Sequence, residues 1–345
     1  LTKMENENTN AIIDSIHFGD KVPLMLVPAI FISTTITHLF GGSAGREGAA
    51  LQIGGSLGCY IGRAFRLDDK DMRLATLCGM SAVFAALFGT PLTATLFALE
   101  VISVGVIYYS ALVPCIVASL FALEMANIFG IAPTHFDVVI EPISELMLLK
   151  VSALAIVCSL MSTVFCLSMH KTEHLFAKLI KNPYLRIAAG GALVVLITAI
   201  LGTGDYNGAG MNIIKRAIEE GQAKPDAFFW KLILTAITIG CGFKGGEVVP
   251  TFFIGATLGC VLGSLLGIPT GFAAALGLIC VFCGAVNCPV ASIVLSIELF
   301  GSTDLVYFAL ACGIAYMLSG YFGLYSSQKI MYSKLKAEFI NIHAK

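Results

Sequence analysis

Charged side chains are scarce in this sequence. Asp, Glu, Lys and Arg make up 12% of the 345 residues, whereas a typical soluble domain has about 25%. The formal net charge is −1, so no basic surface for a nucleic acid is indicated. The 11 cysteines are scattered through apolar stretches without the spacing of a metal site or a disulfide framework. The sequence therefore predicts no metal, no organic cofactor and no nucleic-acid partner, and the cysteines are expected to pack as small buried hydrophobes.

Apolar residues take the place of the missing charge. They make up 57% of the chain, and the mean hydropathy is +0.88. Uncharged runs extend from Val151 to Met169 and from Val248 to Ile297, and a bilayer-spanning helix needs only roughly 20 apolar residues. These runs are continuous rather than alternating, which favours helices over a β-barrel. We predict an all-α polytopic membrane protein of about ten helical segments, several of them too short or too glycine-rich to span alone.

Basic residues indicate the orientation in the membrane. One loop and the C-terminal tail each carry a cluster, and a third lies in the middle of the chain. The positive-inside rule places the first two clusters in the cytoplasm. The first two clusters are Arg63, Arg66, Lys70 and Arg73, and Lys329, Lys334, Lys336 and Lys345; the third is Lys171, Lys178, Lys181 and Arg186.

Two landmarks occur twice in the chain. "IGGSLGCYIG" (53–62) matches "IGATLGCVLG" (254–263) at an offset of 201 residues. "PLTATLFALE" (91–100) matches "PVASIVLSIE" (289–298) at nearly the same offset. Duplicated halves in a membrane protein indicate a transporter or channel whose site lies where the halves meet.

The repeat suggests a division of the chain into five segments. The first residue is Leu1 rather than Met, so we expect a fragment or trimmed form whose first repeat is incomplete. The predicted segments are a polar N-terminal segment at 1–20, a first membrane repeat at 21–170, a basic linker at 171–186, a second membrane repeat at 187–328 and a tail at 329–345.

Glu47 is the most informative single residue. It lies in "GGSAGREGAALQIGG" (41–55), where the glycines favour a break followed by a helix start. A carboxylate within a membrane helix costs roughly 3 kcal/mol on insertion scales and usually marks a transport path. At a helix N-terminus it would occupy the place of an anion and leave it when protonated. The alternative is a capping glutamate beside an arginine at a helix end.

A second helix start is predicted in the other half. "FKGGEVVP" (243–250) places Glu247 and Val248 just before Pro250, and proline is favoured in the first turn of a helix. Two helix starts from two halves would make one anion site from backbone amides. For Glu247 the alternative is an interfacial glutamate paired with Lys244.

These residues resemble motifs of the CLC family of anion channels and anion/proton antiporters. "GREGAALQIGGSLG" (45–58) is similar to the family's GREGP motif, and "GGEVVPTFFIGATLG" (245–259) is similar to its GxFxP motif. "FGTPLTATLFALE" (88–100) and "NCPVASIVLSIELF" (287–300) resemble the proline-led helices that follow each motif. The resemblance implies inverted repeats with broken, re-entrant helices, and a homodimer in which each subunit has its own pore.

The resemblance also assigns roles to residues. Glu47 matches the gating and proton-carrying glutamate, and Glu247 is a second polar group on the path. "GLYSSQKI" (323–330) resembles the segment that bears an anion-binding tyrosine, although from the residues alone Tyr325 is more typical of the membrane interface. The residues implied in anion binding are Gly45, Arg46, Gly48, Val248, Val249 and Tyr325.

Departures from the chloride-type pattern favour the fluoride branch of the family. Glu247 and Val248 replace an apolar residue and a phenylalanine, and Ala49 replaces the proline of GREGP. Val101 stands where chloride/proton exchangers often carry an inner proton glutamate. The resemblance therefore implies a fluoride/proton antiporter, multi-pass in a microbial plasma membrane, that expels fluoride and needs no cofactor. The alternative is a chloride/proton antiporter or voltage-gated-type chloride channel of the same family.

Other histidines and glutamates have simpler interpretations. "HKTEH" (170–174) fits the H-x-x-E-H pattern of some zinc proteases, but no third ligand is nearby in the sequence. Glu100 and Glu298 end apolar helices and are expected to be structural or interfacial, and His38 to be a packed or capping histidine. The family's early helix end should fall near residues 5–14, where "ENENTNAIID" shows no GSGIP-like motif. We do not expect an enzyme or a purely structural scaffold.

Overall fold

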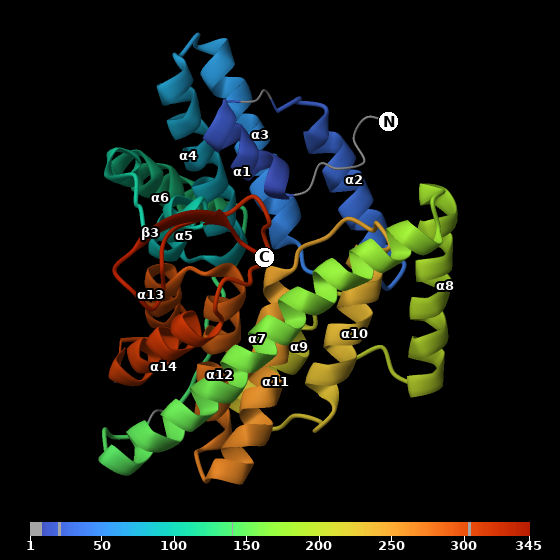
Figure 1. Ribbon diagram of the computed structural model, residues 1–345, viewed down its shortest axis with the longest axis vertical. Coiled ribbons are helices and arrows are strands. Elements are labelled where there is room, and N and C mark those ends of the chain that lie inside the picture. Colours follow the sequence, from blue (N-terminus) through green and yellow to red (C-terminus); the bar gives the residue numbers. More distant parts are fainter. Residues whose placement is uncertain (1–8, 20–21, 140, 303–304) are drawn as a thin grey trace.

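A computed structural model describes residues 9–19, 22–139, 141–302 and 305–345. Within these residues the chain is mostly α-helical, which confirms the predicted fold class (Figure 1). Part of the predicted N-terminal segment, including residues 5–8 of the expected early helix end, lies outside the described residues. The helices up to the middle of the chain are α1 (Thr9–Phe18), α2 (Leu26–Leu39), α3 (Glu47–Ala64), α4 (Asp69–Phe88), α5 (Pro91–Glu100), the 3₁₀ turn η1 (Tyr109–Ala111), α6 (Leu112–Ile128) and α7 (Glu145–Leu179).

The second half of the chain is also helical. α7 continues to Leu179, so the predicted basic linker 171–186 is helical over much of its length. The remaining helices are α8 (Pro183–Leu201), α9 (Met211–Glu219), α10 (Ala227–Gly240), α11 (Val248–Leu266), α12 (Thr270–Val286), α13 (Pro289–Phe300) and α14 (Leu305–Leu318).

Five helices among the described residues are long and apolar enough to cross a membrane. The shorter apolar helices include α2, α10, α12, α13 and α14, which agrees with the expectation of segments too short to span alone. The five longer spans are Asp69–Phe88, Tyr109–Ile128, Glu145–Leu179, Pro183–Leu201 and Val248–Leu266.

Local sequence explains where several helices begin and end. The Asp68 side chain accepts a hydrogen bond from the backbone of Asp71 at the start of α4, and Gly89 ends that helix in a left-handed conformation (φ 75°). Proline occupies the first turn of α5, α8 and α13, where its missing N–H costs no hydrogen bond.

Glycines allow the two repeats to form the same tight helix pair. A Cβ atom on Gly54 of α3 would overlap the carbonyl oxygen of Gly79 on α4. In the second repeat, a Cβ on Gly255 of α11 would overlap the carbonyl oxygen of Gly277 on α12. Small residues let membrane helices approach this closely. Gly255 is the equivalent of Gly54 at the offset of 201 residues, so the sequence repeat corresponds to a repeated packing unit.

Glu100 and Glu298 cap each other's helices. The carboxylate of Glu100, at the end of α5, accepts from the backbone N–H groups of Val290 and Ala291 at 3.2 and 2.9 Å, at the start of α13. Glu298, near the end of α13, accepts from those of Leu92 and Thr93 at 2.9 and 2.8 Å, at the start of α5. This reciprocal capping confirms the structural interpretation of both glutamates.

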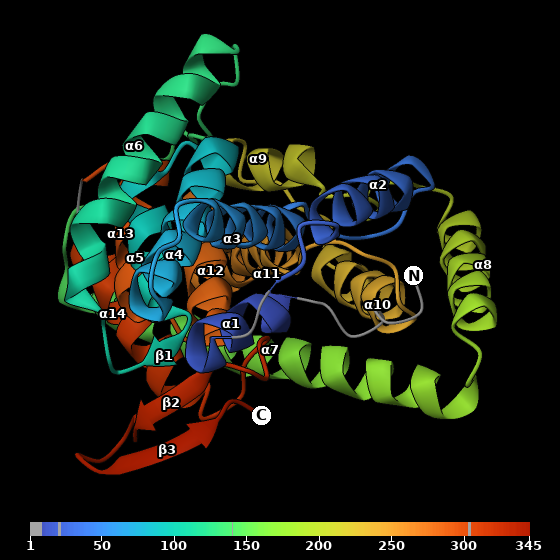
Figure 2. The same ribbon diagram turned by 90° about the horizontal axis from the view of Figure 1, so that it is seen from above.

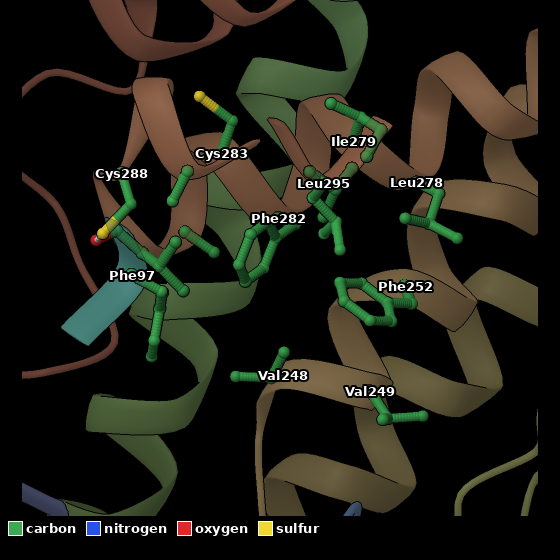
Figure 3. Packing of buried hydrophobic residues seen from close by; sticks show 14 of the residues in the cluster. Phe97, Val248, Val249, Phe252, Leu278, Ile279, Phe282, Cys283, Cys288 and Leu295 are labelled. Atoms are coloured by element: carbon green, nitrogen blue, oxygen red, sulfur yellow. Dashed lines mark hydrogen bonds between the residues drawn. The ribbon is translucent and has the colours of Figure 1, made fainter. Parts of the chain in front are cut away.

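A column of aromatic rings connects helices α4 and α5 of the first half with α11 and α12 of the second. Phe97 of α5 stacks on Phe282 of α12 with ring centroids 6.0 Å apart. Phe282 makes an edge contact with Phe252 of α11 at 5.2 Å, and Phe252 reaches Phe88 of α4 at 5.8 Å. Figure 3 shows Val248 at the start of α11 near this column.

The C-terminal tail forms a small sheet that the sequence analysis did not predict. β2 (Lys329–Tyr332) pairs in parallel with β1 (Ser103–Val104) and antiparallel with β3 (Phe339–His343). Lys334 fixes the tail by donating to Asn287 and Ser319. Figure 2 shows the β2–β3 hairpin and α9 on opposite faces of the molecule.

Candidate anion site where the two repeats meet

The segments before α3 and α11 meet as a pair of antiparallel backbones. The N–H of Gly45 donates to the carbonyl of Gly246 at 2.7 Å, and the N–H of Gly246 donates to that of Gly45 at 2.8 Å. The two glycines are repeat equivalents at the offset of 201 residues, so each pairs with its counterpart in the other half. This pairing brings the starts of α3 at Glu47 and of α11 at Val248 together.

The Glu47 carboxylate lies across this junction. The residue is completely buried and is the first of α3. Its Oε1 atom accepts from the backbone N–H of Val249 at 2.7 Å, and its Oε2 atom accepts from that of Arg46 at 2.6 Å. The carboxylate therefore occupies an anion position at the N-terminus of a helix from the other repeat. Glu47 does cap a helix, as the alternative interpretation expected, but the helix that it caps is α11 of the other half.

Glycine is required around this carboxylate. A Cβ atom on either Gly45 or Gly246 would overlap the Glu47 side chain. A Cβ on Gly48 would lie 3.1 Å from the Cα atom of Gly246. The glycines that flank Glu47 in the sequence thus let the two backbones and the carboxylate share one small space.

Two further candidate residues carry buried oxygen atoms without a protein partner. Within the described part of the chain, the Oε2 atom of Glu247 and the hydroxyl of Tyr325 are buried and make no hydrogen bond. Tyr325 is only 2% exposed, which contradicts the interfacial alternative for this residue. Pairing of Glu247 with Lys244 stays a prediction. Because Tyr325 makes no hydrogen bond to either glutamate, its hydroxyl is available to another acceptor or donor.

The segment that bears Tyr325 is held firmly. The N–H of Leu324 donates to the carbonyl of Ala285 at 2.9 Å. The Gln328 amide donates to the carbonyls of Val101 and Val286 at 3.0 and 2.9 Å. The Tyr325 hydroxyl therefore belongs to a backbone segment that is bonded on both sides to the helices.

A cavity of about 540 Å³ leads to Glu47. Besides Glu47 it is lined by Arg46, whose side chain is exposed, by the end of α4, and by the segment between α8 and α9. Val249 lines it too, so the carboxylate and the amide that binds it both lie at this cavity. The lining residues that sequence reasoning missed are Leu87, Phe88, Thr134, Gly204, Asp205, Asn207, Ala209, Gly210, Met211, Asn212 and Ile213.

An ion pair lies at this cavity. Lys224 donates to Asp205 at 2.9 Å, and this hydrogen bond lowers the pKa of the Asp205 carboxyl below its usual value. Asp205 therefore stays ionised to a lower pH than an ordinary aspartate does. A pH dependence of the site near neutrality would not come from Asp205.

The histidine patterns serve structural contacts. The ring of His170 hydrogen-bonds the carbonyl of Gly323 at 2.8 Å, and that of His38 bonds the carbonyl of Thr34 at 2.9 Å. No group of three His, Cys, Asp or Glu side chains in the described ranges could hold a metal ion. A zinc site at "HKTEH" thus gains no support.

Comparisons with known proteins agree with this geometry. Residues 2–320 match a family model described as voltage gated chloride channel. A chloride/fluoride channel protein of Pseudomonas syringae pv. tomato is 40% identical over 342 residues, which cover 97% of this chain and 75% of that protein. The crystal structure of a CLC-type fluoride/proton antiporter superimposes with a TM-score of 0.91 and 33% identity, covering 95% of this chain and 83% of the other. A slow cyanobacterial Cl⁻/H⁺ antiporter shares the fold, with a TM-score of 0.76 and 20% identity over 90% of this chain and 76% of its own.

Proposed function

The chain belongs to the voltage gated chloride channel (CLC) family, and from this premise we propose that it is a fluoride/proton antiporter that exports fluoride across a microbial plasma membrane. The observation that carries the proposal is the Glu47 carboxylate on the backbone amide of Val249, at the junction of two repeats. A carboxylate that occupies an anion position is suited to exchange places with an anion.

The Glu47 carboxylate and fluoride would exchange at the same backbone N–H donors. An ionised Glu47 accepts from the N–H groups of Arg46 and Val249 and closes the end of the cavity. A proton on the carboxyl removes its charge and weakens both bonds, because bonds to an ionised acceptor are roughly twice as strong. Fluoride then takes the freed N–H groups while the protonated side chain moves away. The side chain then releases its proton towards the cytoplasm and returns ionised, and the carboxylate displaces fluoride towards the outside. Proton and fluoride therefore alternate at one place and move in opposite directions.

Selectivity for fluoride rests on the motifs and on the comparisons. Glu247 and Val248 stand where the chloride-type pattern has apolar and phenylalanine residues. The matching structure named a fluoride/proton antiporter is 33% identical, whereas the one named a Cl⁻/H⁺ antiporter is 20% identical. The same architecture also fits a chloride/proton antiporter or a chloride channel, and this is the second candidate function.

Anion efflux from proteoliposomes tests the proposal. Vesicles loaded with fluoride or with chloride are diluted into anion-free buffer, and the external anion and the pH are recorded together. We expect fluoride efflux to exceed chloride efflux clearly and to drive proton movement in the opposite direction. Faster or equal chloride efflux would favour the second candidate, and anion efflux without proton movement would favour a channel.

The proposed transporter works as a homodimer, with a separate path in each subunit. This part of the proposal rests on the family resemblance and on exposed apolar side chains such as Val113 and Phe121 of α6, which lipid or a second subunit would cover. Mass measurement of the purified protein in detergent, with the detergent contribution subtracted, separates a dimer from a monomer.

A further inference from the structure

Lys231 is a charged residue that neither the motifs nor the proposed exchange step use. It is the one charged residue of α10, "AFFWKLILTAITIG", and it is completely buried. A lysine in the interior of a membrane protein is costly and usually functional. Its position in an otherwise apolar helix was the sequence signal that could have identified it.

The Lys231 ammonium is held by backbone oxygens. It donates to the carbonyl of Tyr206 at 3.1 Å and to that of Gly208 at 2.6 Å, and it lies 5.1 Å from the centre of the Phe253 ring. None of the ion pairs found among the described residues includes Lys231. Carbonyl dipoles and a ring face solvate the cation, and the opposite charge that acts on it from a distance is the Glu47 carboxylate.

The same contacts tie the cavity wall to the segment before Glu47. The carbonyl of Tyr206 also accepts from the Ser43 hydroxyl at 2.8 Å, and that hydroxyl bonds the Thr235 hydroxyl of α10 at 3.0 Å. The N–H of Gly208 donates to the carbonyl of Gly42 at 2.9 Å. Lys231 therefore anchors a wall that is bonded to the loop carrying the carboxylate.

Only one layer of backbone separates this charge from the cavity. Asn207, Ala209 and Gly210 line the cavity, and a Cβ on Gly210 would lie 3.8 Å from the Lys231 Nζ atom. A charge in a poorly hydrated interior acts more strongly on its neighbours than an exposed one, because little solvent screens it. Any anion in this cavity, the ionised Glu47 carboxylate included, is therefore attracted by Lys231 through the wall.

We propose that Lys231 is a positioning residue of the transport site, whose buried positive charge both fixes the cavity wall and raises the affinity of the cavity for its anion. This inference rests on the proposed function, since it assumes that an anion passes through this cavity. It assigns to α10 an electrostatic role that is separate from the hydrogen-bond donors at the start of α11.

Three variants separate charge from hydrogen bonding. Lys231→Met removes the charge and the donors, Lys231→Gln keeps amide donors without charge, and Lys231→Arg keeps charge and donors. Lys150→Met is the matched control, because the Lys150 ammonium also donates to a backbone carbonyl, that of Gly267 at 2.8 Å, but no residue next to Gly267 in the chain lines the cavity. Each protein is checked for a monodisperse elution profile before its fluoride efflux and calorimetric fluoride binding are measured.

The expected pattern is a change in affinity rather than in maximal rate. Lys231→Met and Lys231→Gln should raise KM and Kd for fluoride about tenfold, which corresponds to ~1.4 kcal/mol, while the rate at saturation changes little. Lys231→Arg should restore affinity, and Lys150→Met should match wild type. If Lys231→Met does not fold, the comparison of Lys231→Gln with wild type decides.

Two results would overturn the inference. Wild-type affinity in Lys231→Gln would show that hydrogen bonding alone matters, and wild-type affinity in both neutral variants would leave no role for the residue in anion binding. If the wild-type protein moves chloride instead of fluoride, the proposed function fails, and the same variants are then compared with chloride. The two failures are therefore distinguishable.

Discussion

At the scale of single residues, Glu47 combines two properties that rarely occur together. It is completely buried within a membrane protein, and the hydrogen bonds found for its carboxylate among the described residues come from the backbone N–H groups of Arg46 and Val249. A structural carboxylate would be expected to keep one charge state, and a basic partner would favour the ionised form. No ion pair to the Glu47 carboxylate is found in the described part of the chain, so in the proposed exchange the carboxylate can lose and regain its proton.

Replacement of Glu47 by glutamine tests this role. The amide oxygen can still accept from the Val249 N–H, so the fold should be kept, but the side chain cannot ionise. We expect anion-driven proton movement to fall to the background of empty vesicles, and anion flux to lose the pH dependence that the wild-type protein shows, because the group whose protonation frees the anion position is gone. Flux and external pH are recorded together, with exposed Glu219→Gln as the control. Intact proton coupling in Glu47→Gln would remove this residue from the mechanism.

At the scale of the elements, the sequence predicted the two helix starts but not the contacts between them. Gly45 and Glu47 could be placed at a helix start because glycine and proline act locally on the backbone. Local signals say nothing about which backbone lies opposite, so the pairing of Gly45 with Gly246 and the bond from Val249 required the structure.

The cavity wall was missed for a similar reason. Its residues between α8 and α9 are mostly small or neutral, and each is unremarkable alone. Their position depends on long-range contacts such as the bonds from Lys231 to Tyr206 and Gly208. The sheet in the tail was also missed, because β2 is short and its partner β1 lies far away in the chain.

The reciprocal caps provide a prediction at this scale. In Glu100→Gln, one side-chain oxygen is lost, so one of the two N–H groups of Val290 and Ala291 loses its acceptor. Loss of a helix cap typically costs about 1 kcal/mol, so we expect a lower unfolding temperature. The number of protons moved per anion should not change, because the carboxylate bonds a helix start away from the Glu47 junction. Thermal unfolding and coupled flux are compared with those of Glu219→Gln. Lost coupling with unchanged stability would instead assign Glu100 to the proton path.

At the scale of the whole molecule, the repeat explains why the site lies where the two halves meet. To these contacts each half contributes the start of α3 or α11, one paired glycine and one capping glutamate. The residue that each of them contacts lies in the other half. Gly45 pairs with Gly246, and Glu100 and Glu298 cap opposite halves, so the junction and the caps follow the same pseudo-symmetry. The sequence repeat could reveal the duplication, but not that equivalent residues touch each other.

The orientation of the molecule gives the last prediction. The positive-inside rule places the basic tail in the cytoplasm. The β2–β3 hairpin of that tail and α9, whose first residues line the cavity to Glu47, lie on opposite faces (Figure 2). The cavity should therefore open to the outside, which is the side to which an exporter releases its anion.

Two matched cysteine substitutions test this orientation in intact cells. Lys215 on α9 and Lys336 in the tail are both exposed lysines, whereas every native cysteine is buried or half-buried, so background labelling by a membrane-impermeant thiol reagent should be low. We expect Lys215→Cys to be labelled in intact cells and Lys336→Cys only after permeabilisation. The reverse pattern would place the cavity on the cytoplasmic side. Glu47 would then close the path towards the cytoplasm, and an outward route for fluoride would have to begin at this cavity instead of ending there.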